Sequence, residues 1–296
     1  MQNSKKMTLP PKKILVTSCK GGVGKSTVSA NIAFALAKMG KKVLLCDLDF
    51  GNRCLDLILG VEDRIIYDIY DAACGRVPLE KAILQDDRSK NLWFVSAPYS
   101  YIKMLDEKSL GAFLDKAADR LGLEYIIMDS PCGNDVMLSV AAGVADSAFI
   151  VTMPYSTSIR SAEKTGAMLT RMNVQSQRLI INRFITDSKK RSAKSDQIKV
   201  IELIDKTRIR LIGAVPESEL LVSLQNEGRL VDEGENSNAA QAFENIARRT
   251  TGQNVRLWHN FTANTTDSFL FRKHIKRVRM QKCSLPSLHT IRKKSS

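Results

Sequence analysis

The chain has 296 residues, 44% of them hydrophobic, which is enough to bury one sizeable core and to carry appendages. Its formal net charge of +14 would suit a nucleic-acid-binding protein, but residues 254–296 alone hold ten Lys and Arg against one Asp, so the excess belongs largely to the tail. No apolar run reaches the roughly 18 residues of a membrane-spanning helix, and the charged start has no apolar segment behind it, so we expect a cytoplasmic protein.

Short apolar runs recur along the chain, and each is consistent with a strand that is buried on both faces. Stretches long enough for a helix separate most of them, and the clearest helix is expected from about Lys25 to Met39, with Gly40 as its stop. This alternation predicts an α/β protein with a mostly parallel twisted sheet, helices on both faces, and ligands at the carboxyl ends of the strands. The expected strands centre on residues 14–16, 43–45, 92–95, 125–128, 149–151, 179–181 and 211–212.

The chain divides into three regions by composition. Residues 12–252 carry the alternating pattern and form the predicted main domain, after an N-terminal extension of residues 1–11. Residues 253–296 read as a polar linker followed by a basic tail, and the polar, basic segment 188–197 inside the main domain is predicted to be a mobile loop.

The strongest motif is CKGGVGKST at residues 19–27, which follows a predicted strand and opens a predicted helix. Glycines let backbone N–H groups turn toward a phosphate, and the helix N-terminus adds the positive end of its dipole. Lys25 supplies a point charge, and the hydroxyl of Ser26 suits Mg²⁺. The predicted phosphate-binding residues are Lys20, Gly21, Gly22, Val23, Gly24, Lys25, Ser26 and Thr27.

Three acidic residues follow predicted strands where a phosphate site needs them. Asp47 and Asp49 close the second strand, in the segment CDLDFG, and a carboxylate there can hold a Mg²⁺-bound water or orient the water that attacks a γ-phosphate. Asp129 ends an apolar run and is followed by SPCG, which has the form of a Walker B strand and its switch loop. The predicted metal ligands are Ser26, Asp47 and Asp129.

These motifs resemble the MinD/ParA family of P-loop ATPases, whose deviant loop reads KGGxGK followed by Ser or Thr. The segment DLDFGNRCLDLILGVEDRIIYDIYDAACG, residues 47–75, and the segment PYSTSIRSAEK, residues 154–164, resemble the MinD branch of this family. Cys19 stands where the common P-loop pattern has Gly, and Cys54 stands where the family usually has Asn. Asn52 is shared with FlhG, and APYS at residues 97–100 departs from the family pattern, so the MinD, FlhG and ParA branches all stay open.

The resemblance implies a P-loop NTPase fold and a Mg-dependent ATPase that dimerises on ATP to act as a switch in bacterial cell-division site placement. Lys20 would be the signature lysine that reaches the phosphates of the partner subunit's ATP, Asp49 would position the attacking water, and Asp47 would support Mg²⁺. With Lys25 and Asp129 these complete the expected catalytic set, and slow turnover without an activating partner protein is expected. The resemblance also places adenine contacts at Asn182, Arg183, Val215, Pro216 and Glu217, and an Asn amide suits the edge of adenine.

The basic tail has three interpretations. Over about residues 268–280, Phe271, Ile275 and Val278 share one helical face while Arg272 and Lys276 lie among the basic residues of the other, which is typical of an interfacial helix on anionic lipid. In that case the protein would be peripheral on the inner face of the cell membrane. A solvated basic tail and a tail that contacts nonspecific DNA are the alternatives.

Other functions on the same fold stay open. A ParA-like DNA-partition ATPase or an FlhG-like flagellar-number ATPase would use the same site, and a nucleotide-sensing scaffold would bind ATP and hardly hydrolyse it. An iron–sulfur carrier shares the phosphate loop, but the six cysteines include no Cys-x-x-Cys pair and no zinc-like or disulfide-like spacing, which disfavours it.

Overall fold

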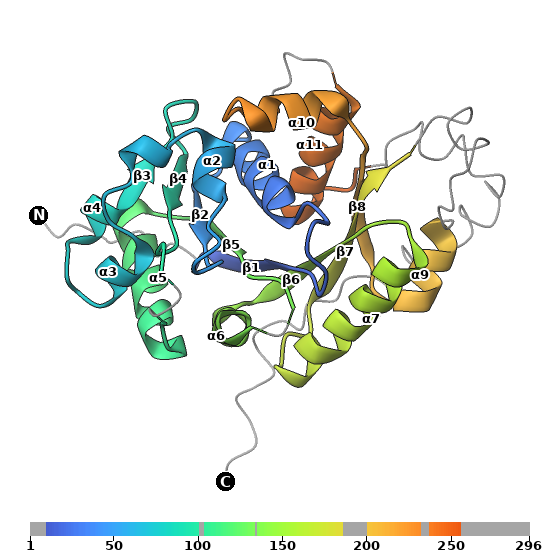
Figure 1. Cartoon of the computed structure of the whole chain (residues 1–296), viewed down its shortest axis with the longest axis horizontal. Coiled ribbons are helices and arrows are strands. Elements are labelled where there is room, and N and C mark those ends of the chain that lie inside the picture. Colours follow the sequence, from blue (N-terminus) through green and yellow to red (C-terminus); the bar gives the residue numbers. More distant parts are fainter. Residues whose placement is uncertain (1–9, 101–103, 134, 186–199, 232–236, 256–296) are drawn as a thin grey trace, which may run out of the picture.

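A computed structural model describes residues 10–100, 104–133, 135–185, 200–231 and 237–255 of the chain (Figure 1). The predicted mobile loop at residues 188–197 lies outside the described residues. So does the basic tail with Phe271, Arg272, Ile275, Lys276 and Val278, so its interpretation stays a prediction.

Eight strands of the described residues form one sheet, in the order β3-β4-β2-β5-β1-β6-β7-β8. Every neighbouring pair is parallel except β3 and β4, which are antiparallel. The predicted mostly parallel α/β fold is therefore confirmed. The strands are β1 (Lys12–Thr17), β2 (Val43–Asp47), β3 (Ile83–Gln85), β4 (Leu92–Val95), β5 (Tyr125–Asp129), β6 (Ser147–Thr152), β7 (Gln177–Phe184) and β8 (Leu211–Pro216).

Helices cover both faces of this sheet (Figure 1). In the view of the figure, α1 (Lys25–Lys38), α2 (Leu55–Leu59), α10 (Glu219–Asn226) and α11 (Asn238–Thr250) lie above the sheet. Below it lie α5 (Glu107–Leu121), α6 (Val136–Val144), α7 (Ser156–Arg171) and α9 (Val200–Thr207). The short elements η1 (Glu62–Arg64), α3 (Ile69–Ala73) and α4 (Leu79–Ala82) connect α2 to β3.

The two layers follow from side chains that alternate along strands with both faces buried. In β1, Ile14 and Val16 pack into the core under α1 and α11, whereas Leu15 packs into the core of α5 and α6. All three side chains are fully buried. A strand between two helical layers needs apolar residues at every position, and this explains the unbroken apolar runs of the sequence.

Helix α1 has the ends that the sequence predicts. It ends at Lys38, and Gly40 follows with a φ of 79°, a left-handed conformation that glycine adopts without steric cost. The amide of Lys41 then donates to the carbonyl oxygen of Leu36 at 3.1 Å, which satisfies a carbonyl of the last turn. Among the described helices, none is long and apolar enough to cross a membrane.

Candidate nucleotide-binding site

The phosphate loop joins the end of β1 to the start of α1 at the carboxyl edge of the sheet (Figure 1). Gly22 and Gly24 have positive φ values of 75° and 84°, so the chain can turn there without a Cβ in the way. Gly24 is the N-cap of α1 and has no side chain that could cap the helix. The first N–H groups of α1 are therefore available to a phosphate oxygen.

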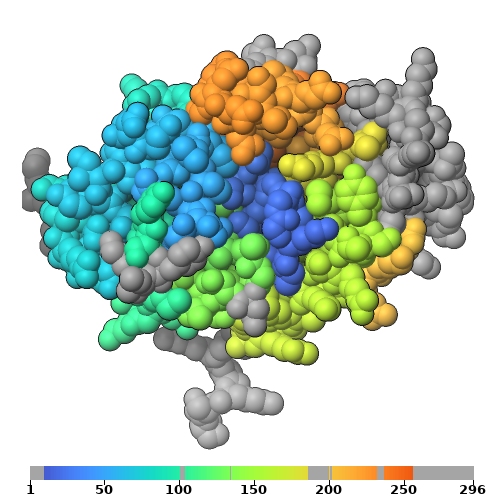
Figure 2. Space-filling model, viewed as in Figure 1, coloured from blue at the N-terminus to red at the C-terminus, as the bar shows by residue number. Residues whose placement is uncertain are grey.

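The loop opens on one face of the molecule. In Figure 2 it forms the blue patch near the centre, between the lighter blue segment around α2, the orange α10 above it and the lime α7. Lys20 and Gly21 are exposed there, whereas Val23 and Lys25 are buried. The loop therefore presents its first half to solvent and anchors its second half in the core.

Lys25 lies against the acidic residues that end the neighbouring strands. Its Nζ atom is 3.6 Å from Oδ2 of Asp129 and 4.0 Å from Oδ2 of Asp49. The register of β2 and β5 places Asp47 directly beside Asp129. Three carboxylates and one ammonium group thus meet at the strand ends, as the sequence predicted.

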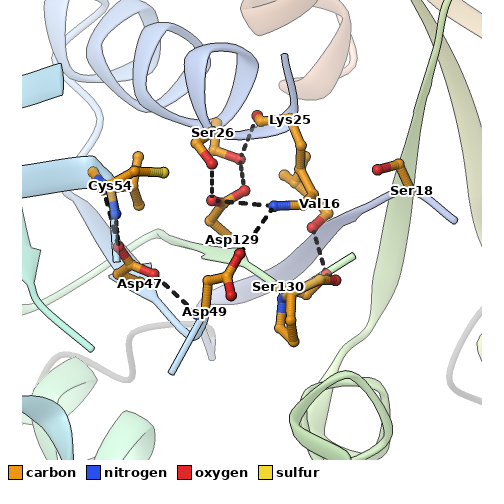
Figure 3. Close-up of polar contacts among 12 residues, drawn as sticks. Val16, Ser18, Lys25, Ser26, Asp47, Asp49, Cys54, Asp129 and Ser130 are labelled. Carbon is orange, nitrogen blue, oxygen red and sulfur yellow. Dashed lines mark hydrogen bonds and ion pairs between the residues drawn. The ribbon is translucent and has the colours of Figure 1, made fainter. Parts of the chain in front are cut away.

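Two hydroxyls of α1 donate to the buried carboxylate of Asp129. The Oγ atom of Ser26 is 2.5 Å from Oδ2, and the Oγ atom of Ser29 is 2.7 Å from Oδ1 (Figure 3). Ser29 was not among the residues predicted from the sequence, although its position three residues after Ser26 puts it on the same face of α1. Both oxygens of Asp129 are therefore held in place by the helix.

Asp47 is tied to the backbone that follows it. Its Oδ1 accepts from the amide of Asp49 at 2.9 Å, and its Oδ2 accepts from the amides of Cys54 and Leu55, each at 3.3 Å. The side chain is fully buried. Asp47 thus shapes the turn that carries Asp49 and starts α2.

Burial changes the proton affinity of this cluster. It raises the pKa of Asp47 to about 7, and the neighbouring charge of Asp129 adds to the effect. It also raises the pKa of Asp49 to about 6, against the opposing charge of Lys25. Burial alone would lower the pKa of Lys25, but the carboxylates of Asp129 and Asp49 outweigh it and hold that pKa above its ordinary value.

The shifted carboxyls predict a pH-dependent stability of the metal-free protein. Both folded-state pKa values lie above the ordinary value of 3.8, so the folded state binds these protons more tightly than the unfolded state. The free energy of unfolding should therefore fall as the pH rises from about 4 to about 7, by on the order of 4 kcal/mol, most of it from the fully buried Asp47. Urea unfolding in EDTA at pH 5 and pH 7.5 measures this change.

The matched variants for this measurement are Asp47→Asn and Asp115→Asn. The first should remove much of the fall, whereas the second changes an exposed carboxylate paired with Lys13 and should leave it intact. An equal fall in Asp47→Asn and the natural protein would contradict the assignment.

Cys54 lies beside Ser26 in this cluster. Burial raises the pKa of its thiol to about 12, and a hydrogen bond with the side chain of Ser26 opposes the shift. At neutral pH the group is a neutral thiol next to the predicted metal ligand. Its neighbour Arg53 pairs with Asp56 at 2.8 Å and lies over the ring of Tyr99, 5.3 Å from its centroid.

The residues predicted to contact adenine meet at the ends of β7 and β8. Phe184 is in register with Pro216, and the amide of Glu217 donates to the carbonyl oxygen of Phe184 at 3.0 Å. Arg183, with a φ of 54°, and Glu217 are exposed, whereas Val215 and Pro216 are buried. The structure thus brings the two predicted segments together, and their contact with a base stays a prediction.

Asn182 makes a contact that the sequence did not indicate. Its Nδ2 donates to the carbonyl oxygen of Val23 in the phosphate loop at 2.8 Å, and the side chain is only 4% exposed. A Cβ built on Gly24 would lie 2.3 Å from this Nδ2 atom. Asn182 therefore supports the phosphate loop from β7.

A second support comes from α10 and the segment that follows it. The hydroxyl of Thr27 donates to Oε1 of Gln225 at 3.0 Å, and Oδ1 of Asn31 accepts from the amide of Val231 at 3.0 Å. Both contacts join positions about 200 residues apart in the chain, so no local pattern could reveal them. They fix α1 against the segment that follows β8.

The side chains at this edge fit Mg²⁺. The hydroxyl of Ser26 and the carboxylates of Asp47, Asp49 and Asp129 offer hard oxygen ligands next to the phosphate loop. Within the described residues no group of three or more His, Cys, Asp or Glu is placed so that it could hold a metal ion by itself. Mg²⁺ at phosphate sites is usually held by one or two protein oxygens together with substrate oxygens and water, so this donor set suffices.

Sequence comparisons relate the chain to the ParA family and to MinD proteins. A model of the ParA family, described as NUBPL iron-transfer P-loop NTPase, matches residues 11–251. The septum site-determining protein MinD of Synechocystis sp. is 35% identical over 255 residues, which cover 86% of this chain and 94% of that protein. MinD of Helicobacter pylori is 35% identical over 249 residues, covering 82% of this chain and 91% of that protein.

Solved structures agree with the sequence relatives. A chain of the MinC:MinD cell division protein complex of Aquifex aeolicus has a TM-score of 0.76 and 38% identity, covering 84% of this chain and 98% of that one. The septum site-determining protein MinD complexed with Mg-ADP from Pyrococcus horikoshii has a TM-score of 0.70 and 27% identity, covering 81% and 96%. The chain therefore belongs to the ParA family of P-loop NTPases, as a MinD-like ATPase.

Proposed function

We propose that this protein is a Mg-dependent ATPase that dimerises on ATP and acts as a switch in placing the bacterial cell-division site. The observation that carries the proposal is the cluster of Lys25, Asp49 and Asp129 behind the phosphate loop, with Ser26 hydrogen-bonded to Asp129. Similarity to MinD proteins over most of the chain supports the cellular role. The active unit in this proposal is the domain of residues 12–252.

The chemistry follows from charge and position. The loop N–H groups and Lys25 would bind the phosphates of ATP, while Ser26 and Asp129, supported by Asp47, would hold Mg²⁺, which supplies positive charge against the phosphate oxygens when bound. Asp49 is 15% exposed, so its carboxylate can orient a water molecule at the edge of the site. Lys20 is exposed at the mouth, where it would reach the ATP of a second subunit.

Partners would act on this dimer. The Aquifex aeolicus structure is a complex of MinC with MinD, so we propose that a protein partner binds this chain in a similar way and that an activator speeds its turnover. In the described structure, Nζ of Lys20 lies 3.4 Å from the hydroxyl of Thr157 at the start of α7. Dimerisation would replace this weak contact, because Lys20 would turn to a phosphate.

The tail would bring the ATP-bound dimer to an anionic membrane surface, so that the protein alternates between the cytoplasm and the inner face of the cell membrane. The test is co-sedimentation with anionic liposomes in ATP and Mg²⁺ against ADP, for the full chain and for a chain truncated after Gln253. We expect ATP to bring only the full chain onto lipid. Equal sedimentation of both chains, or no effect of nucleotide, would contradict the membrane role.

Rival functions give different results in the same tests. ATP-dependent binding to nonspecific DNA that weakens steeply with salt would favour a ParA-like partition ATPase. ATP binding without phosphate release at excess ATP would favour a nucleotide-sensing scaffold. The similarity to MinD proteins ranks both below the cell-division role.

The hydrogen bond from Asn182 to the phosphate loop should contribute to nucleotide affinity. In Asn182→Ala the carbonyl oxygen of Val23 loses a buried donor, so we expect ATP and ADP to bind about 10-fold more weakly, close to 1.4 kcal/mol. Titration calorimetry measures both affinities. The control is Asn91→Ala, which removes a longer amide-to-carbonyl bond, 3.4 Å to the carbonyl oxygen of Ala37, away from the phosphate loop.

A comparison of ATP with GTP separates the two roles of Asn182. If Asn182 only supports the loop, Asn182→Ala lowers the affinities for ATP and GTP by the same factor. If Asn182 also contacts adenine, the affinity for ATP falls more than the affinity for GTP. Unchanged affinity for both nucleotides would contradict either role.

A further inference from the structure

Two cysteines lie on either side of the phosphate loop. Cys132, in the loop after β5, is exposed, and Cys19, directly before Lys20, is partly exposed. The Sγ atom of Cys132 would lie 3.8 Å from a Cβ built on Gly21, so this sulfur contacts the phosphate loop itself. Gly21 follows Cys19 by two residues, so the sulfur of Cys132 lies close to the segment that carries Cys19.

A backbone hydrogen bond brings the two cysteines together. The amide of Gly133 donates to the carbonyl oxygen of Ser18 at 3.1 Å. This bond joins the peptide group that follows Cys132 to the one that precedes Cys19. Standard backbone dimensions then put the two Cα atoms about 5–8 Å apart, which overlaps the separations of roughly 4.4–6.8 Å found in disulfides.

The other described cysteines differ from this pair. Cys46 is fully buried in β2 and Cys54 contacts Ser26, whereas Cys74 is exposed at the end of α3, away from the phosphate loop. Cys74 is thus an exposed thiol that serves as an internal control. Oxidation depends on access, and for a disulfide it depends also on a second thiol within reach.

We propose that Cys19 and Cys132 form a reversible disulfide when the nucleotide-free protein meets a peroxide. In the first step the sulfur of Cys132 takes one oxygen from the peroxide and becomes a sulfenic acid, with release of one water from hydrogen peroxide. The thiol of Cys19 then attacks that sulfur, the S–S bond forms and the S–O bond breaks with loss of a second water. Two thiols lose two electrons in total, and the peroxide gains them.

The disulfide would switch off the site. It joins the phosphate loop covalently to the loop after β5, beside Gly21, and so restrains the phosphate loop on the face where Lys20 is exposed. This functional consequence rests on the proposed ATPase, whereas the disulfide itself does not. Oxidised protein should lose ATP-dependent phosphate release, and dithiothreitol should restore it.

Peptide mapping tests the disulfide directly. Full-length, nucleotide-free protein is treated with hydrogen peroxide, alkylated and digested with trypsin without reduction. Trypsin places Cys19 in residues 14–20 and Cys132 in residues 121–160, so a cross-linked pair has a unique mass. We expect this cross-linked pair in the natural protein and in Cys74→Ser, and we expect it to be absent in Cys132→Ser. Because the disulfide lies within one chain, the oxidised natural protein should run as a monomer on a non-reducing gel.

Two results would overturn the inference. In the first, Cys132 is oxidised only as far as the sulfenic acid and Cys19 is still alkylated as a free thiol. In the second, a disulfide through Cys132 links two chains into a dimer. Phosphate release by reduced protein separates the two proposals. If reduced protein hydrolyses ATP and the pair is absent, only the disulfide fails. If the pair forms and reduced protein releases no phosphate, only the ATPase proposal fails.

Discussion

Replacing Lys25 by alanine should lower ATP hydrolysis by at least about 100-fold, because the variant loses the buried charge that faces both the phosphates and the carboxylate cluster. The Lys25 side chain is 8% exposed, and its Nζ atom lies 3.6 Å from Asp129 and 4.0 Å from Asp49. Its removal also leaves the fully buried carboxylate of Asp129 and the partly exposed carboxylate of Asp49 without this cation. We therefore expect the metal-free variant to be less stable by roughly 3 kcal/mol at neutral pH.

Phosphate release under excess ATP and Mg²⁺ measures the first effect, and urea unfolding measures the second. Lys38→Ala is the matched control, since this lysine lies in the last turn of the same helix and is exposed. Circular dichroism shows whether Lys25→Ala still folds. A variant that folds and keeps more than about a tenth of the natural rate would contradict the role given to this charge.

Replacing Gly24 by alanine should strongly reduce ATP affinity, because the added Cβ has no room. Gly24 has a φ of 84°, and a Cβ there would lie 2.3 Å from Nδ2 of Asn182. The variant must strain the backbone, which costs about 1–2 kcal/mol, and must also displace the donor that holds Val23. We expect ATP affinity to fall by at least about 30-fold, near 2 kcal/mol.

Gly40→Ala isolates the backbone contribution to this effect. Gly40 has a similar φ of 79°, but nothing lies within 4 Å of its added Cβ. The Gly40→Ala variant should therefore be less stable than the natural protein but should bind ATP with the same affinity. Equal ATP affinities in Gly24→Ala and Gly40→Ala would show that the contact between Asn182 and the loop does not matter.

The elements with strong local signals were predictable from the sequence. The buried parallel strands read as apolar runs because both of their faces are covered, and the predicted strand centres all lie in observed strands. The exception is β3, which the sequence did not indicate. It has three residues, Ile83–Gln85, follows α4 without a loop and pairs only with β4 at the sheet edge, so it has too few residues to show a period.

The site was predictable where function depends on spacing within one segment. The motif at residues 19–27 and the acidic residues that end β2 and β5 converge because parallel strands end at the same edge of the sheet. Contacts between distant segments were not predictable. The bond from Asn182 to Val23 joins residues 159 positions apart, and nothing near either residue indicates the other.

The most direct test of the account is the oligomeric state of Asp49→Asn protein in ATP with Mg²⁺ and in ADP, measured by light scattering, with and without the added substitution Lys20→Ala. Asp49→Asn slows hydrolysis in this account and so keeps ATP bound. We predict a dimer in ATP and a monomer in ADP for Asp49→Asn, and a monomer in both nucleotides once Lys20 is replaced. A Lys20→Ala variant that dimerises on ATP as fully as its parent would contradict the proposed switch.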